Sequence, residues 1–166
     1  MDPVGYKCDV TPATHRQLIS ALRDALAVAE AAHASATEGV THEDARSEGD
    51  KDMRATEQSY VARGQAMRVE ELRAGLAAVE KMRARAWGED EPIASGALVS
   101  VLDDDDGATH RYLIAPAGGG TQLAGGVQVV TPKSPLGRAL CGKRAGDEVE
   151  VAIAGATRTL TIDEVG

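Results

Sequence analysis

Residues 131–151 read Thr-Pro-Lys-Ser-Pro-Leu-Gly-Arg-Ala-Leu-Cys-Gly-Lys-Arg-Ala-Gly-Asp-Glu-Val-Glu-Val, and this stretch decides the fold of the C-terminal half. Ser134 is suited to cap a helix over Pro135–Cys141, because a proline at the first helical position loses an N–H that would be unpaired anyway. Gly142 falls where such a helix ends, and Glu148–Val151 alternates as a strand does. The stretch therefore predicts a Ser-Pro turn, one short helix and a following strand.

Alternation of apolar and polar residues extends this interpretation over the C-terminal half. Segments with a period of two are found at residues 97–102, 110–115, 126–131, 147–153 and 157–165. Asp103–Asp106 followed by Gly107 predicts an acidic hairpin turn. The expected product is an antiparallel sheet with the short helix packed on one face.

The N-terminal half has helical periodicity in two segments, from Pro12 to about Thr37 and from about Met53 to Ala86. The apolar stripe of the first consists of Leu18, Leu22, Ala25, Ala29, Ala32 and Ala36. The stripe of the second consists of Val69, Leu72, Leu76 and Val79, with coiled-coil spacing. We expect Gly39 to stop or bend the first helix, and the polar residues 42–52 to join the two helices as an antiparallel hairpin.

These patterns predict an α+β protein with two domains. Residues 1–88 form the antiparallel coiled-coil hairpin, and residues 92–166 form a small antiparallel β domain. The segment Gly88–Pro92 links them, because a proline and three charges cannot extend a packed seam.

Composition limits the possible functions. The chain has 26 acidic and 18 basic residues, which argues against a general basic surface for duplex DNA. Cys8 and Cys141 lie far apart without a metal-binding pattern, as expected for free thiols in a reducing cytoplasm. No secretory signal and no apolar run of about 18 residues is seen, so we expect a cytoplasmic protein without a membrane partner. The four histidines are scattered, so we expect no metal site built from histidine, and no phosphate-binding or nucleophile motif occurs.

The order Ser-Pro-Leu-Gly, Ala-Leu, Gly-Lys, Gly-Asp-Glu-Val within residues 134–149 closely resembles the C-terminal domain of the GreA/GreB transcript-cleavage factors of bacterial RNA polymerase. The resemblance covers nearly the whole chain and implies an FKBP-like β domain after the hairpin. In that family the β domain grips the rim of the polymerase secondary channel, and the hairpin passes down the channel. Acidic residues at its tip help hold a second Mg²⁺ in the polymerase active site, which promotes hydrolysis of backtracked RNA. The implied protein is a monomer that binds RNA polymerase and contacts nascent RNA only indirectly. It has no catalytic residue or cofactor of its own, and its Mg²⁺ is shared with the polymerase.

Three groups of residues become site candidates through this resemblance. The candidates for polymerase binding are Lys133, Ser134, Pro135 and Leu136. The candidates for metal binding in trans are Glu48, Asp50 and Asp52, and those for RNA contact are Arg54, Arg63 and Arg68. Each group also has a plain structural explanation. The first is then a helix start, the second a solvated loop, and the third a set of ion pairs with Glu57, Glu70 and Glu71.

The hairpin tip departs from the family pattern, which resembles Gly-Asp-Leu-Ser-Glu-Asn-Ala-Glu-Tyr. Aligning its last residue with Tyr60 places the two functional acids at Met53 and Thr56, which carry no carboxylate. Aligning the first two residues of the pattern with Gly49 and Asp50 keeps the aspartate. Met53 then stands where the glutamate is expected. Polymerase binding is therefore better supported than stimulation of cleavage.

Alternative functions remain open. The first is a non-cleaving competitor or inhibitor in the secondary channel. The second is a coiled-coil adaptor, which leaves the residues 134–151 unexplained. The third is a peptidyl-prolyl isomerase, for which the β domain lacks an aromatic-lined pocket, since it offers one tyrosine and no Phe or Trp.

Overall fold

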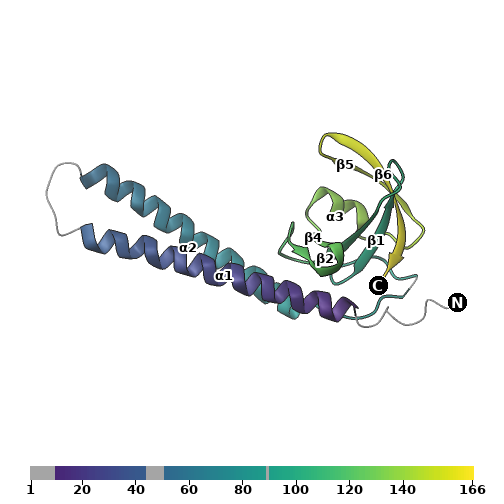
Figure 1. The fold of residues 1–166 in the computed structure, drawn as a ribbon, viewed down its shortest axis with the longest axis horizontal. Helices are drawn as coiled ribbons and strands as arrows, with labels where there is room; N and C mark the ends of the chain where they lie inside the picture. The colour runs from purple at the N-terminus through teal and green to yellow at the C-terminus, as the bar shows by residue number, and fades with distance from the viewer. Residues whose placement is uncertain (1–9, 44–50, 89) are drawn as a thin grey trace. The chain divides into compact units, whose positions relative to one another are not determined.

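The protein is described here by a computed structural model, which covers residues 10–43, 51–88 and 90–166. Residues 21–77 form one compact unit, and the other described residues form a second (Figure 1). No helix in these ranges is both long enough and apolar enough to cross a membrane.

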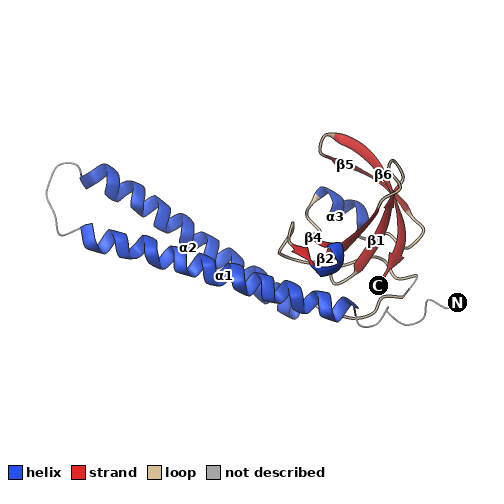
Figure 2. Cartoon of the chain, in the orientation of Figure 1, coloured by secondary structure: helices blue, strands red, loops and turns tan. Residues whose placement is uncertain are grey.

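Two long helices form the predicted antiparallel hairpin (Figure 2). Helix α1 spans Val10–Glu43 and α2 spans Lys51–Lys81. Arg73 Nη2 lies 2.7 Å from Glu30 Oε1, which joins the two helices within residues 21–77. Nearer the ends of the hairpin, His15 Nε2 lies 2.7 Å from the carbonyl oxygen of Val79. The pairing of early α1 residues with late α2 residues requires that the helices run in opposite directions.

Most of the predicted seam is buried. Among its members, the fully or nearly fully buried side chains are Leu18, Leu22, Ala29, Val69, Leu72 and Val79. Leu76, Ala25 and Ala36 are half-buried, and Ala32 is exposed. The stripe of α1 is therefore shorter than predicted, because alanine side chains are too small to stay covered where the buried residues of the seam end.

Both predicted helix ends are corrected by the structure. Helix α1 continues past Gly39 to Glu43. A single glycine costs a helix only about 1 kcal/mol relative to alanine, which does not suffice to stop it. Helix α2 ends at Lys81 and not near Ala86, and its end is tightened by a hydrogen bond from Met82 N to Val79 O of 3.1 Å.

The C-terminal half forms a sheet of six strands in the order β3-β4-β2-β1-β6-β5. The strands are β1 Leu98–Asp103, β2 Thr109–Ile114, β3 Gln122–Leu123, β4 Val127–Val130, β5 Glu148–Ile153 and β6 Ala156–Val165. Five of them match the predicted segments, and the two-residue β3 was missed. A short 3-10 turn, η1 Ala124–Gly126, separates β3 from β4.

The sheet is mixed, which corrects the predicted all-antiparallel arrangement. Strand β4 pairs with β2 in parallel, with Arg111 opposite Val127 and Ile114 opposite Val130. All other strand pairs are antiparallel. A parallel neighbour needs a connection of about a dozen residues that returns the chain to the starting edge. The segment 115–126 between β2 and β4, which contains the three glycines at 118–120 and strand β3, provides that return.

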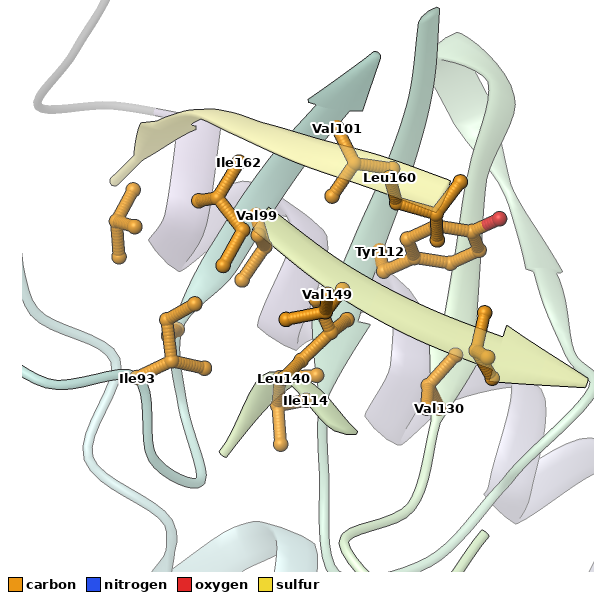
Figure 3. Packing of buried hydrophobic residues seen from close by; sticks show 13 residues of the cluster. Ile93, Val99, Val101, Tyr112, Ile114, Val130, Leu140, Val149, Leu160 and Ile162 are labelled. Carbon is orange, nitrogen blue, oxygen red and sulfur yellow. The ribbon is translucent and has the colours of Figure 1, made fainter. Parts of the chain in front are cut away.

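The core lies between the sheet and helix α3, Pro135–Leu140. Figure 3 shows Leu140 of α3 beside Ile114 of β2 and Val149 of β5. These three side chains are buried, as are Val99 and Ile162 of the neighbouring strands. Alternate residues of each strand point to this side, which is why the period of two in the sequence located the core.

The linker before the sheet is folded against the domain. Arg85 forms two hydrogen bonds to Glu91, of 2.7 and 3.2 Å, and its guanidinium lies 4.1 Å from the centroid of the Trp87 ring. Glu91 also accepts a hydrogen bond of 2.9 Å from Gly88 N. Trp87 is half-buried against the core cluster. These contacts explain the early end of α2, because tertiary packing of this segment outweighs its helix propensity.

Candidate partner-binding site

The predicted Ser-Pro turn is present, and Ser134 holds it together. Its side-chain oxygen donates to Thr131 O at 2.8 Å and accepts from Gly137 N at 3.0 Å. Its backbone N donates to the same Thr131 oxygen at 3.0 Å. Pro135 occupies the start of α3, where the missing N–H costs no hydrogen bond within the helix. The helix-cap interpretation of Ser134 and Pro135 is confirmed.

Gly137 is required by close packing. A Cβ atom at this position would lie 1.9 Å from Thr131 O and 2.7 Å from Thr131 C. These are backbone atoms of the same turn, so they cannot move aside as a flexible side chain would. The first turn of α3 therefore rests directly on the end of β4, and only glycine fits there.

The rigid turn presents two neighbouring residues to solvent. Lys133 and Pro135 are exposed, whereas Leu136 is half-buried against the core cluster. Ser134 is itself half-buried by its hydrogen bonds. Of the four predicted polymerase-binding residues, Lys133 and Pro135 are thus the ones available for contact, while Ser134 and Leu136 support them.

More cations follow the turn in a chain whose net charge is −8. Arg138, Lys143 and Arg144 are exposed. The loop that carries the last two is fixed by a hydrogen bond of 2.7 Å from Ile93 N to Lys143 O, and by one of 2.8 Å from Arg144 Nε to Asp90 O. Residues 131–144, which we call the α3 region, therefore present several exposed positive charges, which suits an acidic partner surface.

The predicted metal-binding acids lie mostly outside the described residues. Glu48 and Asp50 fall in the gap between residues 43 and 51. Asp52 is the second residue of α2, and its side chain is likewise outside the description. The proposed role of these three acids stays a prediction.

The predicted RNA-contacting arginines have different surroundings. Arg68 lies 3.7 Å from Glu71, an exposed pair of little energetic weight. Arg54 lines an open hollow of about 490 Å³ between the helices, together with Glu57 and Ser35. Arg63 lines a second hollow, of about 370 Å³, beside Tyr60. Contact of these arginines with RNA stays a prediction.

Arg73, by contrast, is engaged in the fold. It pairs with Glu70 at 2.9 Å as well as with Glu30, and the hydrogen bonds to Glu30 and then to Glu70 raise the pKa of Arg73. Arg73 thus forms ion pairs of the kind that offer a plain explanation for the other arginines of α2.

The structure also contains a charged cluster that the sequence did not reveal. Asp103 is buried, and its carboxylate accepts a hydrogen bond of 2.5 Å from Arg158 of β6. Asp106 lies 3.4 Å from the same guanidinium nitrogen. The bond from Arg158 holds the pKa of Asp103 below its usual range. His110 contributes a ring nitrogen within 4.8 Å of both carboxylates, but Arg158 already supplies their positive charge. The cluster is therefore a structural ion pair between strands.

Two further side chains bear on enzymatic alternatives. Tyr112, the tyrosine of the β domain, is buried in the core cluster, so it cannot line an open pocket for a prolyl substrate. Cys141 is a free thiol packed on the same cluster, and burial raises its pKa. A thiol with a raised pKa is a poor nucleophile at neutral pH.

Comparison with known proteins identifies the domain that carries the turn. The family model described as transcription elongation factor GreA/GreB, C-terminal, matches residues 89–166. Transcription elongation factor GreA of Rhodospirillum rubrum is 38% identical over 68 residues, which are 41% of each chain. GreA of Phenylobacterium zucineum is 35% identical over 96 residues, 54% of this chain and 59% of that protein. The matches thus span about half the length of these relatives.

Solved structures give looser matches. GreA factor homolog 1 (Gfh1) of Thermus thermophilus is 18% identical, with a TM-score of 0.41 over 89% of this chain and 94% of that one. GreA/GreB of Nitrosomonas europaea is 22% identical, with a TM-score of 0.37 over 58% of this chain and 78% of that one. The assignment rests on the sequence matches. Residues 89–166 are thus similar to the C-terminal domain of the GreA/GreB transcription elongation factors.

Proposed function

We propose that this protein binds bacterial RNA polymerase through the α3 region and inserts its hairpin into the secondary channel, where it modulates elongation. The family match of residues 89–166 carries the proposal. The ordered turn at Ser134 supports it, because the turn holds Lys133 and Pro135 at the surface without a flexible loop. Pre-ordered contact residues lose less conformational entropy on binding.

The partner surface should be acidic. Lys133, Arg138, Lys143 and Arg144 lie within twelve residues and are exposed. Charge complementarity of this kind raises the association rate and fixes orientation more than it adds affinity. We therefore expect binding to weaken as salt is raised, since exposed charges are screened beyond about 8 Å at physiological ionic strength.

Binding to purified core RNA polymerase tests the proposal. Lys133→Glu combined with Pro135→Ala changes only exposed side chains and should weaken binding about tenfold or more, the size of one lost charge-assisted contact. Lys81→Glu, also exposed, is the matched control and should leave the affinity unchanged. Ser134→Ala is a poor test, because losing the cap costs about 1 kcal/mol of stability.

Two results would count against the proposal in different ways. Unchanged affinity of the folded Lys133/Pro135 variant removes the turn from the interface. Absence of any binding by the wild-type chain removes RNA polymerase as the partner.

A second function, that of a competitor without cleavage activity, is favoured by one specific observation. In either alignment of the tip with the family pattern, Met53 occupies a position where a functional acid is expected. The chain would then occupy the channel and exclude cleavage factors, without supplying a complete pair of carboxylates to the second metal ion.

A further inference from the structure

Helix α2 carries a second apolar face besides its buried seam. Met53, Tyr60 and Met67 are 80%, 68% and 61% exposed and follow one another at intervals of seven residues. Seven residues make almost two helical turns, so the three side chains share one face. The buried seam residues Val69 and Leu72 fall on a different face. We call Met53, Tyr60, Gly64 and Met67 the outer stripe.

Single exposed apolar residues are ordinary, but three large ones that recur at one heptad position form a continuous row along the helix. Tyr60 also borders a shallow hollow of about 370 Å³, with Thr56 and Arg63 among its lining residues. The outer stripe thus offers protruding apolar side chains beside a depression, as a surface that receives another helix does.

Gly64 is the most informative member of the outer stripe. It lies in the interior of α2, where glycine weakens a helix relative to alanine. A Cβ atom there would meet nothing within 4 Å, so packing within the described chain does not require glycine. Close approach of a second helix backbone would require glycine, because a residue without a Cβ atom lets two backbones come together.

We propose that the outer stripe binds the outer stripe of a second copy of this chain, with the two α2 helices antiparallel and Gly64 near the twofold axis. In this register Tyr60 of each copy lies against Met67 of the other. Aromatic rings and thioethers make favourable contacts. The same surface serves both partners, as twofold symmetry demands.

Charge supports this register. Glu57 and Arg68 are eleven residues apart, about three turns, so they flank the outer stripe on the same side. Antiparallel pairing about Gly64 brings Glu57 of one copy within about one turn of Arg68 of the other, twice per dimer. Parallel pairing would leave the two residues about 16 Å apart along the axis. Among the described residues, Arg68 pairs with Glu71 through an exposed contact of 3.7 Å, which is weak enough to let Arg68 reorient.

The dimer is a weak one. Three large side chains and a glycine per helix make an interface below the roughly 1,200 Å² at which stable complexes begin. The monomer expected from the sequence is then the form at low concentration. The dimer covers the α2 face from Met53 to Met67, so dimerisation and insertion of the hairpin into a channel would exclude each other.

Sedimentation equilibrium of the full chain, from about 5 µM to 1 mM, tests the proposal. The wild type should shift from monomer toward dimer over this range. Met67→Lys should weaken association at least tenfold. Val28→Lys is the matched control, because Val28 is an apolar residue of α1 that is 70% exposed and lies outside the stripe. Circular dichroism should show unchanged helix content in both variants, since both positions are exposed.

Two further variants test the register. Gly64→Gln should make α2 more stable to heat while weakening the dimer, two effects that a purely structural role would not combine. Glu57→Arg and Arg68→Glu should each weaken the dimer, and both changes in one chain should restore it. A wild type that stays monomeric at 1 mM, equal losses in Met67→Lys and Val28→Lys, or no recovery in the double charge swap would overturn the proposal. None of these results depends on RNA polymerase.

Discussion

Asp103 shows how one residue can join two neighbouring strands that lie far apart in the sequence. It ends β1 at a position whose side chain points inward, and it meets Arg158 of β6, 55 residues later. A carboxylate in such a place is stable only when a cation and donors satisfy it. Arg158 supplies the cation, and the backbone N of Asp105 donates to the other carboxylate oxygen at 3.0 Å.

Asp103→Asn should therefore change the response of stability to acid. Because the folded-state pKa of Asp103 is lowered by Arg158, the unfolded chain takes up the proton first as pH falls. The stability that Asp103 contributes is fully present at pH values above its unfolded-state pKa of about 3.9. It is lost as the pH falls through the folded-state pKa. We expect the variant to melt at a lower temperature at pH 7 and to lose less stability than wild type between pH 5 and pH 2. Thermal melts across that range measure this.

The exposed neighbour Asp105 provides the control for this test. Asp105→Asn leaves the bond from its backbone to Asp103 in place and should follow the wild-type profile. If the melting temperature of Asp103→Asn depended on pH in the same way as that of the wild type, the ion pair with Arg158 would contribute nothing to folding.

At the scale of single residues, the sequence predicts what depends on local chemistry. Ser134 and Pro135 form a helix start within four residues, so the pattern alone was sufficient. The need for glycine at position 137 depends on where the backbone of Thr131 lies. The burial of the Asp103 carboxylate depends on Arg158, a partner from another strand. The inward position of Asp103 in the alternating pattern was the one signal available.

At the scale of elements, the helical hairpin depends on a short stretch of large buried side chains. Leu18 and Val79 are completely buried, whereas Leu76 is half-buried. Alanines continue the seam of α1 and contribute little apolar area. The stability of this helix pair should therefore concentrate at its leucine and valine positions.

Leu18→Ala should cost about 2–5 kcal/mol of unfolding free energy, because a buried side chain is replaced by a cavity. Leu76→Ala should lie at the lower end, about 2 kcal/mol, because part of that side chain stays in contact with water. Val28→Ala, at an exposed site of α1, should stay within about 0.5 kcal/mol. Urea titrations followed by circular dichroism give all three values. A loss of only a few tenths in Leu18→Ala would mean that this residue does not pack as described.

Periodicity found the helices and five strands because each is long enough to repeat. Strand β3 has two residues, too few for any period to appear. The parallel pairing of β2 with β4 is a long-range choice of partner, which alternation along one strand does not encode. Residues 82–86 were predicted to be the end of the second helix, because the packing of the adjacent Trp87 on the core cluster is tertiary and leaves no periodic pattern.

At the scale of the whole molecule, binding and cleavage make separate demands. The proposed binding needs the α3 region and a hairpin that fits a channel. Stimulation of cleavage further needs carboxylates placed around a Mg²⁺ ion, which requires near-octahedral geometry at about 2.1 Å. Asp50 and Asp52 have suitable ligand atoms, but their spacing differs from the family pattern. We therefore expect this chain to occupy the channel with little stimulation of cleavage.

Backtracked transcription complexes separate the two activities in one assay. Wild type should stimulate RNA cleavage far less than a GreA cleavage factor does, and it should inhibit that factor when both are present. Replacing both Asp50 and Asp52 with alanine should remove whatever cleavage remains while leaving the inhibition intact, because the α3 region is unchanged. Asp24→Ala, an exposed acid of α1, is the control for lost charge. Strong cleavage that survives the double replacement would exclude these two acids as metal ligands. Strong cleavage that the double replacement abolishes would instead make this protein a cleavage factor in its own right, since the two carboxylates would then be completing the second metal site despite their altered spacing.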